Sequence, residues 1–327
     1  MTRLLALLLA MVAALFTAAL LVLPAKVSVA DSLSALFTGD KGPLTLVMRE
    51  IRLPRAILAS MIGASLGLAG AAMQGYLRNP LAEPGLIGVS GSAALGAVLA
   101  IHTGLSATFA LGLPLAALTG AFLGVVLVMS LAGPRGTSLT LILAGIAISA
   151  LAAAITSFVL NLSPNPFAAN EIVFWMMGSL TDRSMTHVWL ALPFMALGFG
   201  VLARRGRGRD ALTLGEDAAL AMGIRGDRLR RQLVIGTACV VGAGTAVAGA
   251  IGFVGLVIPH ILRPLVGAHP SRLLWASALG GAAMLLAADI AVRVVLPGRD
   301  LKLGVLTALV GAPLFLHLIL KLRRERI

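Results

Sequence analysis

The sequence predicts an all-α, multi-pass membrane protein that forms a single transmembrane domain over residues 1–327. Composition is the first reason, because 59% of the residues are hydrophobic and 12% are charged, and the mean hydropathy is +1.00. One soluble core could not bury so many apolar side chains. The second reason is a series of apolar runs, most of them close to the roughly 20 residues that a helix needs to cross a bilayer.

Ten such runs predict about ten transmembrane helices, which places both termini on one side of the membrane. The run from Leu4 to Leu23 is long enough to span, so we interpret it as the first helix rather than as a signal peptide cleaved after Ala30. The span at 254–267 is too short to cross alone, and we expect Pro259 to break it and leave a buried half-helix. The other spans are 54–75, 85–103, 108–131, 138–160, 187–203, 232–252, 272–295 and 303–321.

The 26 lysines and arginines indicate the orientation of these spans. With both termini in the cytoplasm, 17 of the cations lie inside and 9 lie outside, as the positive-inside rule favours. The net charge of +13 is therefore explained by topology in a lipid membrane. A nucleic-acid partner is not expected, because no basic face carries interleaved aromatic residues.

The polar segment at 204–231 stands out from this apolar background, since it holds eight of the arginines. Thr213 and Glu216 have the spacing of a capping box, which predicts a short helix that begins there. Gly223 is placed to end that helix in a left-handed conformation, and Asp227 is placed to cap a second helix. These paired helix signals favour a cytoplasmic docking surface, with a simple solvated connection as the alternative.

An internal repeat is visible between two of the spans. Residues 62–71 (IGASLGLAGA) align without gaps on residues 241–250 (VGAGTAVAGA), and the same offset places Pro80 on Pro259 and Gly88 on Gly267. The copies begin on the second and seventh helices, which run in opposite directions. An inverted repeat of this kind is common in transporters, although two Gly- and Ala-rich helices can also match by chance.

Catalytic, cofactor and metal motifs are not found in the sequence. It has no G-x-x-x-x-G-K-[ST] loop for nucleotide phosphates and no paired histidine motif for zinc. We therefore expect no catalytic residues, no metal ligands and no cofactor in this chain. His260 and Asp289 lie in or near spans, where ionisable groups are either functional or satisfy a helix break.

Four blocks carry a resemblance to a known family, and together they cover nearly the whole chain. The sequence resembles the FecCD-type permeases, which are membrane subunits of ABC importers for iron-siderophores, haem and cobalamin. The blocks are LPRAILASMIGASLGLAGAAMQGYLRNPLAEPGLIGVSGS (53–92), LGEDAALAMGIRGDRL (214–229), GFVGLVIPHILRPLVG (252–267) and LGVLTALVGAPLFLHLI (303–319).

This resemblance implies the type II ABC importer permease fold in a bacterial inner membrane. It also implies a second permease copy or a close paralogue, two ABC ATPase subunits that bind ATP and Mg²⁺ inside, and a periplasmic substrate-binding protein outside. The chain itself would be a transport subunit and not an enzyme. An iron-siderophore is the expected cargo, because it is the commonest one in the family, with haem or cobalamin as the alternatives.

The resemblance also assigns roles to individual residues. The ATPase-coupling residues are Thr213, Leu214, Gly215, Glu216, Asp217, Ala218, Met222, Gly223 and Arg228. The residues that dock the binding protein are Arg52 and Arg55, with Arg293 and Arg299 as alternatives for a third position. The residues at the cytoplasmic gate are Asn79 and Pro80 of the N-P-L-A motif and Thr137 or Ser138 at the start of the fifth helix.

A secondary transporter would also show inverted repeats, but it would not need a helical docking loop. A channel would need no partner at all. Co-purification with an ATPase subunit distinguishes the ABC permease from both.

Overall fold

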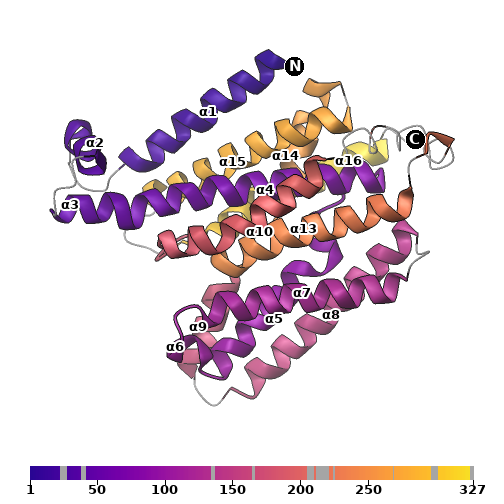
Figure 1. Cartoon of the computed structure of the whole chain (residues 1–327), viewed down its shortest axis with the longest axis horizontal. Helices are drawn as coiled ribbons and strands as arrows, with labels where there is room; N and C mark the ends of the chain where they lie inside the picture. Colours follow the sequence, from indigo (N-terminus) through magenta and orange to yellow (C-terminus); the bar gives the residue numbers. More distant parts are fainter. Residues whose placement is uncertain are drawn as a thin grey trace.

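A computed structural model describes residues 1–22, 28–37, 42–133, 137–163, 166–204, 210, 221–223, 225–267, 269–295 and 301–324. Helices account for most of these residues, and they lie side by side in a bundle (Figure 1). The α-helices are α1 Thr2–Leu21, α2 Val29–Phe37, α3 Pro43–Leu46, α4 Leu53–Leu77, α5 Val89–His102, α6 Leu105–Thr108, α7 Gly112–Ala132, α8 Ser138–Asn161, α9 Pro166–Met176, α10 Met185–Ala203, α13 Gly226–Ala248, α14 Val254–Leu262, α15 Pro270–Val295 and α16 Leu303–Arg324. A π-helix η1 (Val47–Arg52) joins α3 to α4, and two 3₁₀ turns follow as η2 (Pro84–Ile87) and η3 (Pro264–Val266).

The predicted spans all correspond to helices. Within the described ranges, eight helical segments have the length and apolar composition to cross a membrane. The two shorter ones are α5, with 14 residues, and α14, with nine. The all-α, multi-pass fold predicted from composition is therefore confirmed.

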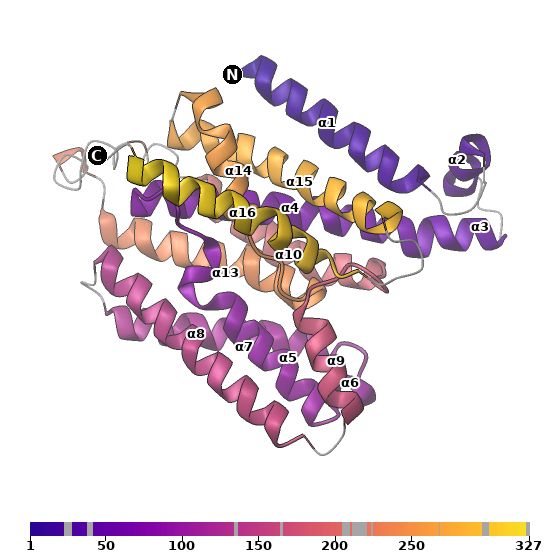
Figure 2. The same cartoon turned by 180° about the vertical axis from the view of Figure 1, so that it is seen from behind.

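Two helices, α4 and α13, form the centre of the bundle, and most residues of each are buried. In Figure 1, α1 and α15 lie on one side of this pair, while α5, α7 and α8 lie on the other. Figure 2 shows the opposite face of the bundle, where α16 lies in front of both α4 and α10. The N-terminal end of α1 and the C-terminal end of α16 point toward the same end of the bundle, as the even number of spans predicts.

Part of the packing around α4 and α13 corresponds as an inverted repeat requires, although α10 also packs against both helices. Helix α4 contacts α13, α14 and α15, and helix α13 contacts α4, α5 and α7. Both copies also contain a 3₁₀ turn that ends at a left-handed glycine, with φ +76° at Gly88 and +64° at Gly267. The aligned prolines differ, because Pro80 lies in a loop whereas Pro259 lies inside α14.

The expected break at Pro259 is wrong. Helix α14 continues through this proline and ends only at Leu262, after which η3 begins at Pro264. The expectation that this span is a buried half-helix is correct, since six of its nine residues are buried.

Candidate functional site

Buried charges gather at the end of the bundle where α4 begins. Asp289 of α15 is 1% exposed, and its Oδ1 lies 2.7 Å from Nε of Arg55 on α4. Its Oδ2 lies 3.0 Å from Nη2 of Arg293, one turn further along α15. A carboxylate with this little access to water needs such partners, because an unpaired buried charge is strongly destabilising.

The same cluster holds the end of α1. Nη1 of Arg52 donates to the carbonyl oxygens of Leu20 and Val22, both at 2.7 Å. Nη1 of Arg293 donates to the carbonyl oxygen of Ala19 at 2.9 Å. The last carbonyls of a helix have no partner within the helix, so Arg52 and Arg293 cap α1 with positive charge where the helix dipole favours it.

Three of the four predicted docking arginines therefore lie together, but they are not free. Arg52 is buried, with 7% of its surface exposed, and Arg55 and Arg293 share Asp289. Arg299 lies outside the described residues, so the structure does not decide between Arg293 and Arg299. The docking role of these side chains stays a prediction.

The predicted gate residues lie at the opposite end of the bundle, where α4 ends and α8 begins. Asn79 is exposed, and its Oδ1 accepts a hydrogen bond from the backbone N–H of Leu81 at 2.9 Å. Thr137 is the N-cap of α8 and accepts from the N–H of Thr140 at 3.3 Å, with Ser138 as the first residue of the helix. Pro80 is half-buried between Asn79 and Leu81. The gate role itself stays a prediction.

The predicted coupling residues are described only in part. Thr213, Leu214, Gly215, Glu216, Asp217 and Ala218 lie outside the described residues. Met222 and Arg228 are exposed, and Gly223 has the predicted left-handed φ of +75°. The expectation that Asp227 is an N-cap is wrong, because α13 begins at Gly226 with Arg225 as its N-cap. Asp227 is instead a first-turn acid, and it pairs with Arg231 at 3.1 Å.

Glu83, in the loop that follows the gate motif, was not singled out from the sequence. Its Oε1 accepts a hydrogen bond of 2.8 Å from the backbone N–H of Phe253, at the start of α14. Burial raises the pKa of the Glu83 carboxyl above its ordinary value of 4.5, and the Phe253 bond opposes that shift. No local sequence pattern could have identified Glu83, because its hydrogen-bond partner lies 170 residues away in the sequence.

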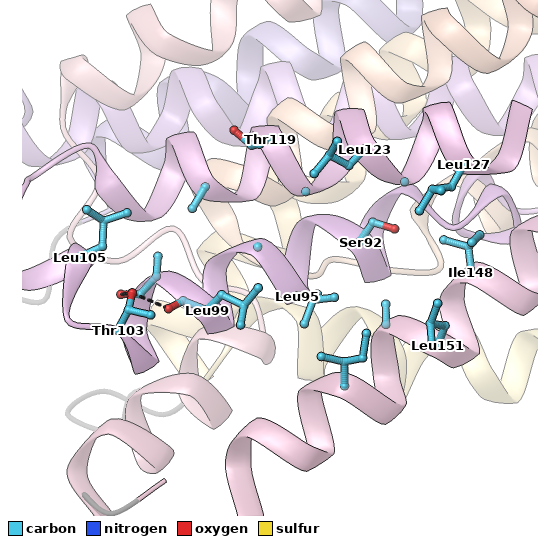
Figure 3. A pocket seen from close by; sticks show the side chains of 17 residues that line it. Ser92, Leu95, Leu99, Thr103, Leu105, Thr119, Leu123, Leu127, Ile148 and Leu151 are labelled. Carbon is cyan, nitrogen blue, oxygen red and sulfur yellow. Dashed lines mark hydrogen bonds between the residues drawn. The ribbon is translucent and has the colours of Figure 1, made fainter. Parts of the chain in front are cut away.

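Two apolar hollows lie on the flanks of the bundle. The first, of about 440 Å³, is enclosed by α5, α7 and α8 and is lined mainly by small residues and leucines (Figure 3). The hydroxyls of Thr103 and Thr119 in its wall donate to carbonyls of their own helices, at 2.8 Å each. This hollow offers no charged group, so it suits hydrocarbon rather than a polar ligand.

The second hollow, of about 640 Å³, lies where α16 passes the start of α14. Its lining includes Met176 and Met177, Phe253 next to the start of α14, and Ala308 and Pro313 of α16. Among the described residues, no group of three or more His, Cys, Asp or Glu side chains is placed to hold a metal ion.

Comparisons with known proteins agree with this geometry. A model of the FecCD transport family matches residues 9–321. A solved metal-chelate type ABC transporter in an inward-facing conformation matches with a TM-score of 0.87 and 32% identity, over 98% of this chain and 100% of that chain. PsaBC from Streptococcus pneumoniae has a TM-score of 0.55 at 15% identity and shares the fold alone.

Curated relatives match over most of their length. The Bacillus subtilis ABC transporter permease protein YvrB is 38% identical over 88% of this chain and 82% of the relative. The Halobacterium salinarum cobalamin import permease BtuC is 39% identical over 84% of this chain and 73% of the relative. The vitamin B12 import permease BtuC of Escherichia coli O9:H4 is 38% identical over 85% of each.

The fold and these matches define a multi-span transport permease of an ABC importer, a subunit that is not itself the ATPase. The chain belongs to the FecCD transport family.

Proposed function

We propose that this permease imports a bulky metal chelate, with cobalamin as the first candidate and an iron-siderophore as the second. The relatives named for cobalamin or vitamin B12 import support the first, with 37–39% identity over more than four fifths of this chain. The family's range of cargo keeps the iron chelate open.

The proposed transporter contains a second permease copy or a paralogue, two ATPase subunits and a periplasmic binding protein, in a bacterial inner membrane with both termini in the cytoplasm. We expect no cofactor in this chain. The arginine content of residues 204–231 supports placing that segment inside. The short helices that the sequence predicts there would receive the ATPase, with Glu216 and Asp217 expected in the first turn of the first of these helices.

Docking of the binding protein would occur at the opposite end. Acidic side chains on that protein would compete with Asp289 for Arg55 and Arg293, since both guanidinium groups already face one carboxylate. Electrostatic contacts of this kind mainly raise the association rate and weaken with salt. Arg52 would contribute indirectly, because its guanidinium group holds the end of α1.

The deciding experiment is reconstitution of the permease with its ATPase and binding protein in proteoliposomes. We expect ATP-driven uptake of cyanocobalamin, and the same assay with an iron(III) hydroxamate siderophore tests the second candidate. A Glu216→Arg, Asp217→Arg double variant should lose uptake while the permease remains folded. Failure of any ATPase subunit to co-purify with the permease, or normal uptake by the double variant, would contradict the proposal.

A further inference from the structure

Helix α14 contains a gap in its own hydrogen-bond ladder. Pro259 has no backbone N–H, so the carbonyl of Gly255, four residues earlier, lacks the donor that an α-helix ordinarily supplies to it. A buried carbonyl without a partner is destabilising, and Gly255 is buried. The helix nevertheless continues for three residues beyond Pro259 and ends at Leu262.

The missing donor comes from α4. Nε2 of Gln74 lies 3.5 Å from the carbonyl oxygen of Gly255 and 3.3 Å from that of Leu256. The Oε1 atom of the same side chain accepts a hydrogen bond of 2.7 Å from Nη2 of Arg263, the C-cap of α14. One amide, 1% exposed, therefore joins the interior of α14 to its C-terminal end.

Close contact between the two backbones lets Gln74 reach this carbonyl. Gly70, one turn before Gln74 on α4, packs directly on Gly255, and a Cβ atom at Gly70 would overlap the Gly255 carbonyl. A Cβ atom at Gly255 would lie 2.8 Å from the carbonyl oxygen of Leu66. Small residues at such a crossing allow helices in membranes to approach closely.

The segment between Gln74 and Glu83 contains the predicted gate residues Asn79 and Pro80, and both of its ends are bonded. At one end the carbonyl oxygen of Gln74 accepts from the N–H of Asn79 at 3.2 Å, while the Gln74 side chain holds α14. At the other end Glu83 accepts from Phe253 at the start of α14. The loop is thus attached to α14 before and after the gate motif.

We propose that Gln74 is a positioning residue for transport: its amide replaces the N–H that Pro259 lacks, and by tying α14 to α4 it sets the position of the Asn79–Pro80 segment. This inference rests on the predicted gate role of Asn79 and Pro80 in the proposed transporter. Gln74 itself does not contact the cargo in this proposal.

A labelling experiment on the permease alone tests this role. Cys239 is the only cysteine in the sequence, so a Cys239→Ala, Leu81→Cys background carries a single thiol beside the gate motif. Leu81 is half-buried, and its modification by a membrane-impermeant maleimide in open membrane sheets reports release of the segment. We expect Gln74→Met to raise the modification rate roughly tenfold, because it leaves buried polar groups unpaired.

A second substitution that restores the labelling rate distinguishes a positioning role of Gln74 from a general loss of folding. Adding Pro259→Ala to Gln74→Met returns an N–H to the Gly255 carbonyl and should bring the rate back toward that of the parent. The matched control is Pro193→Ala, which restores an N–H inside α10 and should not rescue. If Gln74→Met does not accumulate in membranes, Gln74→Glu replaces it, since its carboxylate still accepts from Arg263 but cannot donate to Gly255.

An unchanged labelling rate in the Gln74 variant, or equal rescue by Pro193→Ala, would overturn the inference. The readout uses neither ATP nor cargo, so it is independent of the proposed function. If the parent permease binds no ATPase, the proposed function fails while the labelling result still stands. If the parent transports and the rescue pattern is absent, only the role of Gln74 fails.

Discussion

The two copies of the repeat share two aligned glycine pairs, Gly63 with Gly242 and Gly70 with Gly249, but the first pair is packed differently in each copy. On α4, a Cβ atom at Gly63 would overlap the backbone of Gly281 on α15. On α13, the aligned Gly242 would place a Cβ atom 3.0 Å from the Cβ of Ala121 on α7, which is tight but does not involve backbone. The α4–α15 contact is therefore a direct contact of backbones, whereas the α13–α7 contact is made by side chains.

The aligned positions one turn further along, Gly67 on α4 and Ala246 on α13, show the same difference. Gly67 of α4 faces the carbonyl of Ser277, where a Cβ atom would overlap, and the second copy has Ala246 at that position. Small residues alone thus do not identify a close helix contact, because one copy requires glycine where the other accommodates a methyl group. The α4–α15 contact also carries the buried pair of Arg55 and Asp289.

The largest effect should come from removing the charge at the end of that contact. Asp289→Asn leaves Arg55 and Arg293 without their common counter-ion, and loss of one partner of a buried pair costs about 3–5 kcal/mol. We expect a marked fall in the Tm of the purified permease in detergent. The matched control is Asp227→Asn, which breaks an exposed pair with Arg231 and should leave Tm unchanged. Equal Tm values for the two variants would show that the Asp289 cluster does not stabilise the fold.

A second substitution adds a methyl group within the same contact. Gly67→Ala forces a Cβ atom onto the Ser277 carbonyl, and because backbone cannot move aside cheaply we expect a loss of about 3 kcal/mol. Gly242→Ala, in the corresponding α13–α7 contact, should cost less, since Ala121 can shift by a few tenths of an ångström. Thermal unfolding of both variants measures the difference, and a greater loss at Gly242 would reverse the comparison.

Hydropathy predicted the spans well because crossing a membrane is a local requirement on each segment. The short span at 254–267 was recognised from its length together with Pro259. The continuation of α14 through Pro259 could not be predicted, since its hydrogen-bond donor is Gln74, 181 residues away from Gly255. Asp289 was recognised only as an ionisable group in a span, because its partner Arg55 is 234 residues distant.

The predicted site residues show the same limit. The resemblance predicted Arg52 and Arg55 as docking residues, with Arg293 or Arg299 at a third position, and the structure brings Arg52, Arg55 and Arg293 together. The blocks did not reveal that Arg52 caps α1 through the carbonyls of Leu20 and Val22. Such bonds depend on the position of a distant helix end, which no local pattern encodes.

The smallest expected effect is a gain in stability, and it tests whether the packing around α13 can accommodate an added methyl group. Gly244 is buried inside α13, and a Cβ atom there would lie 3.5 Å from Cγ2 of Ile62, an ordinary contact distance. Glycine in a helix interior is less favourable than alanine by about 0.5–1 kcal/mol, because it loses more conformational freedom on folding. Gly244→Ala should therefore raise the Tm slightly, whereas Gly63→Ala on α4 should lower it. A fall in Tm for Gly244→Ala would mean that the α13 helix is packed as tightly as α4, and the contrast between the two copies would then be lost.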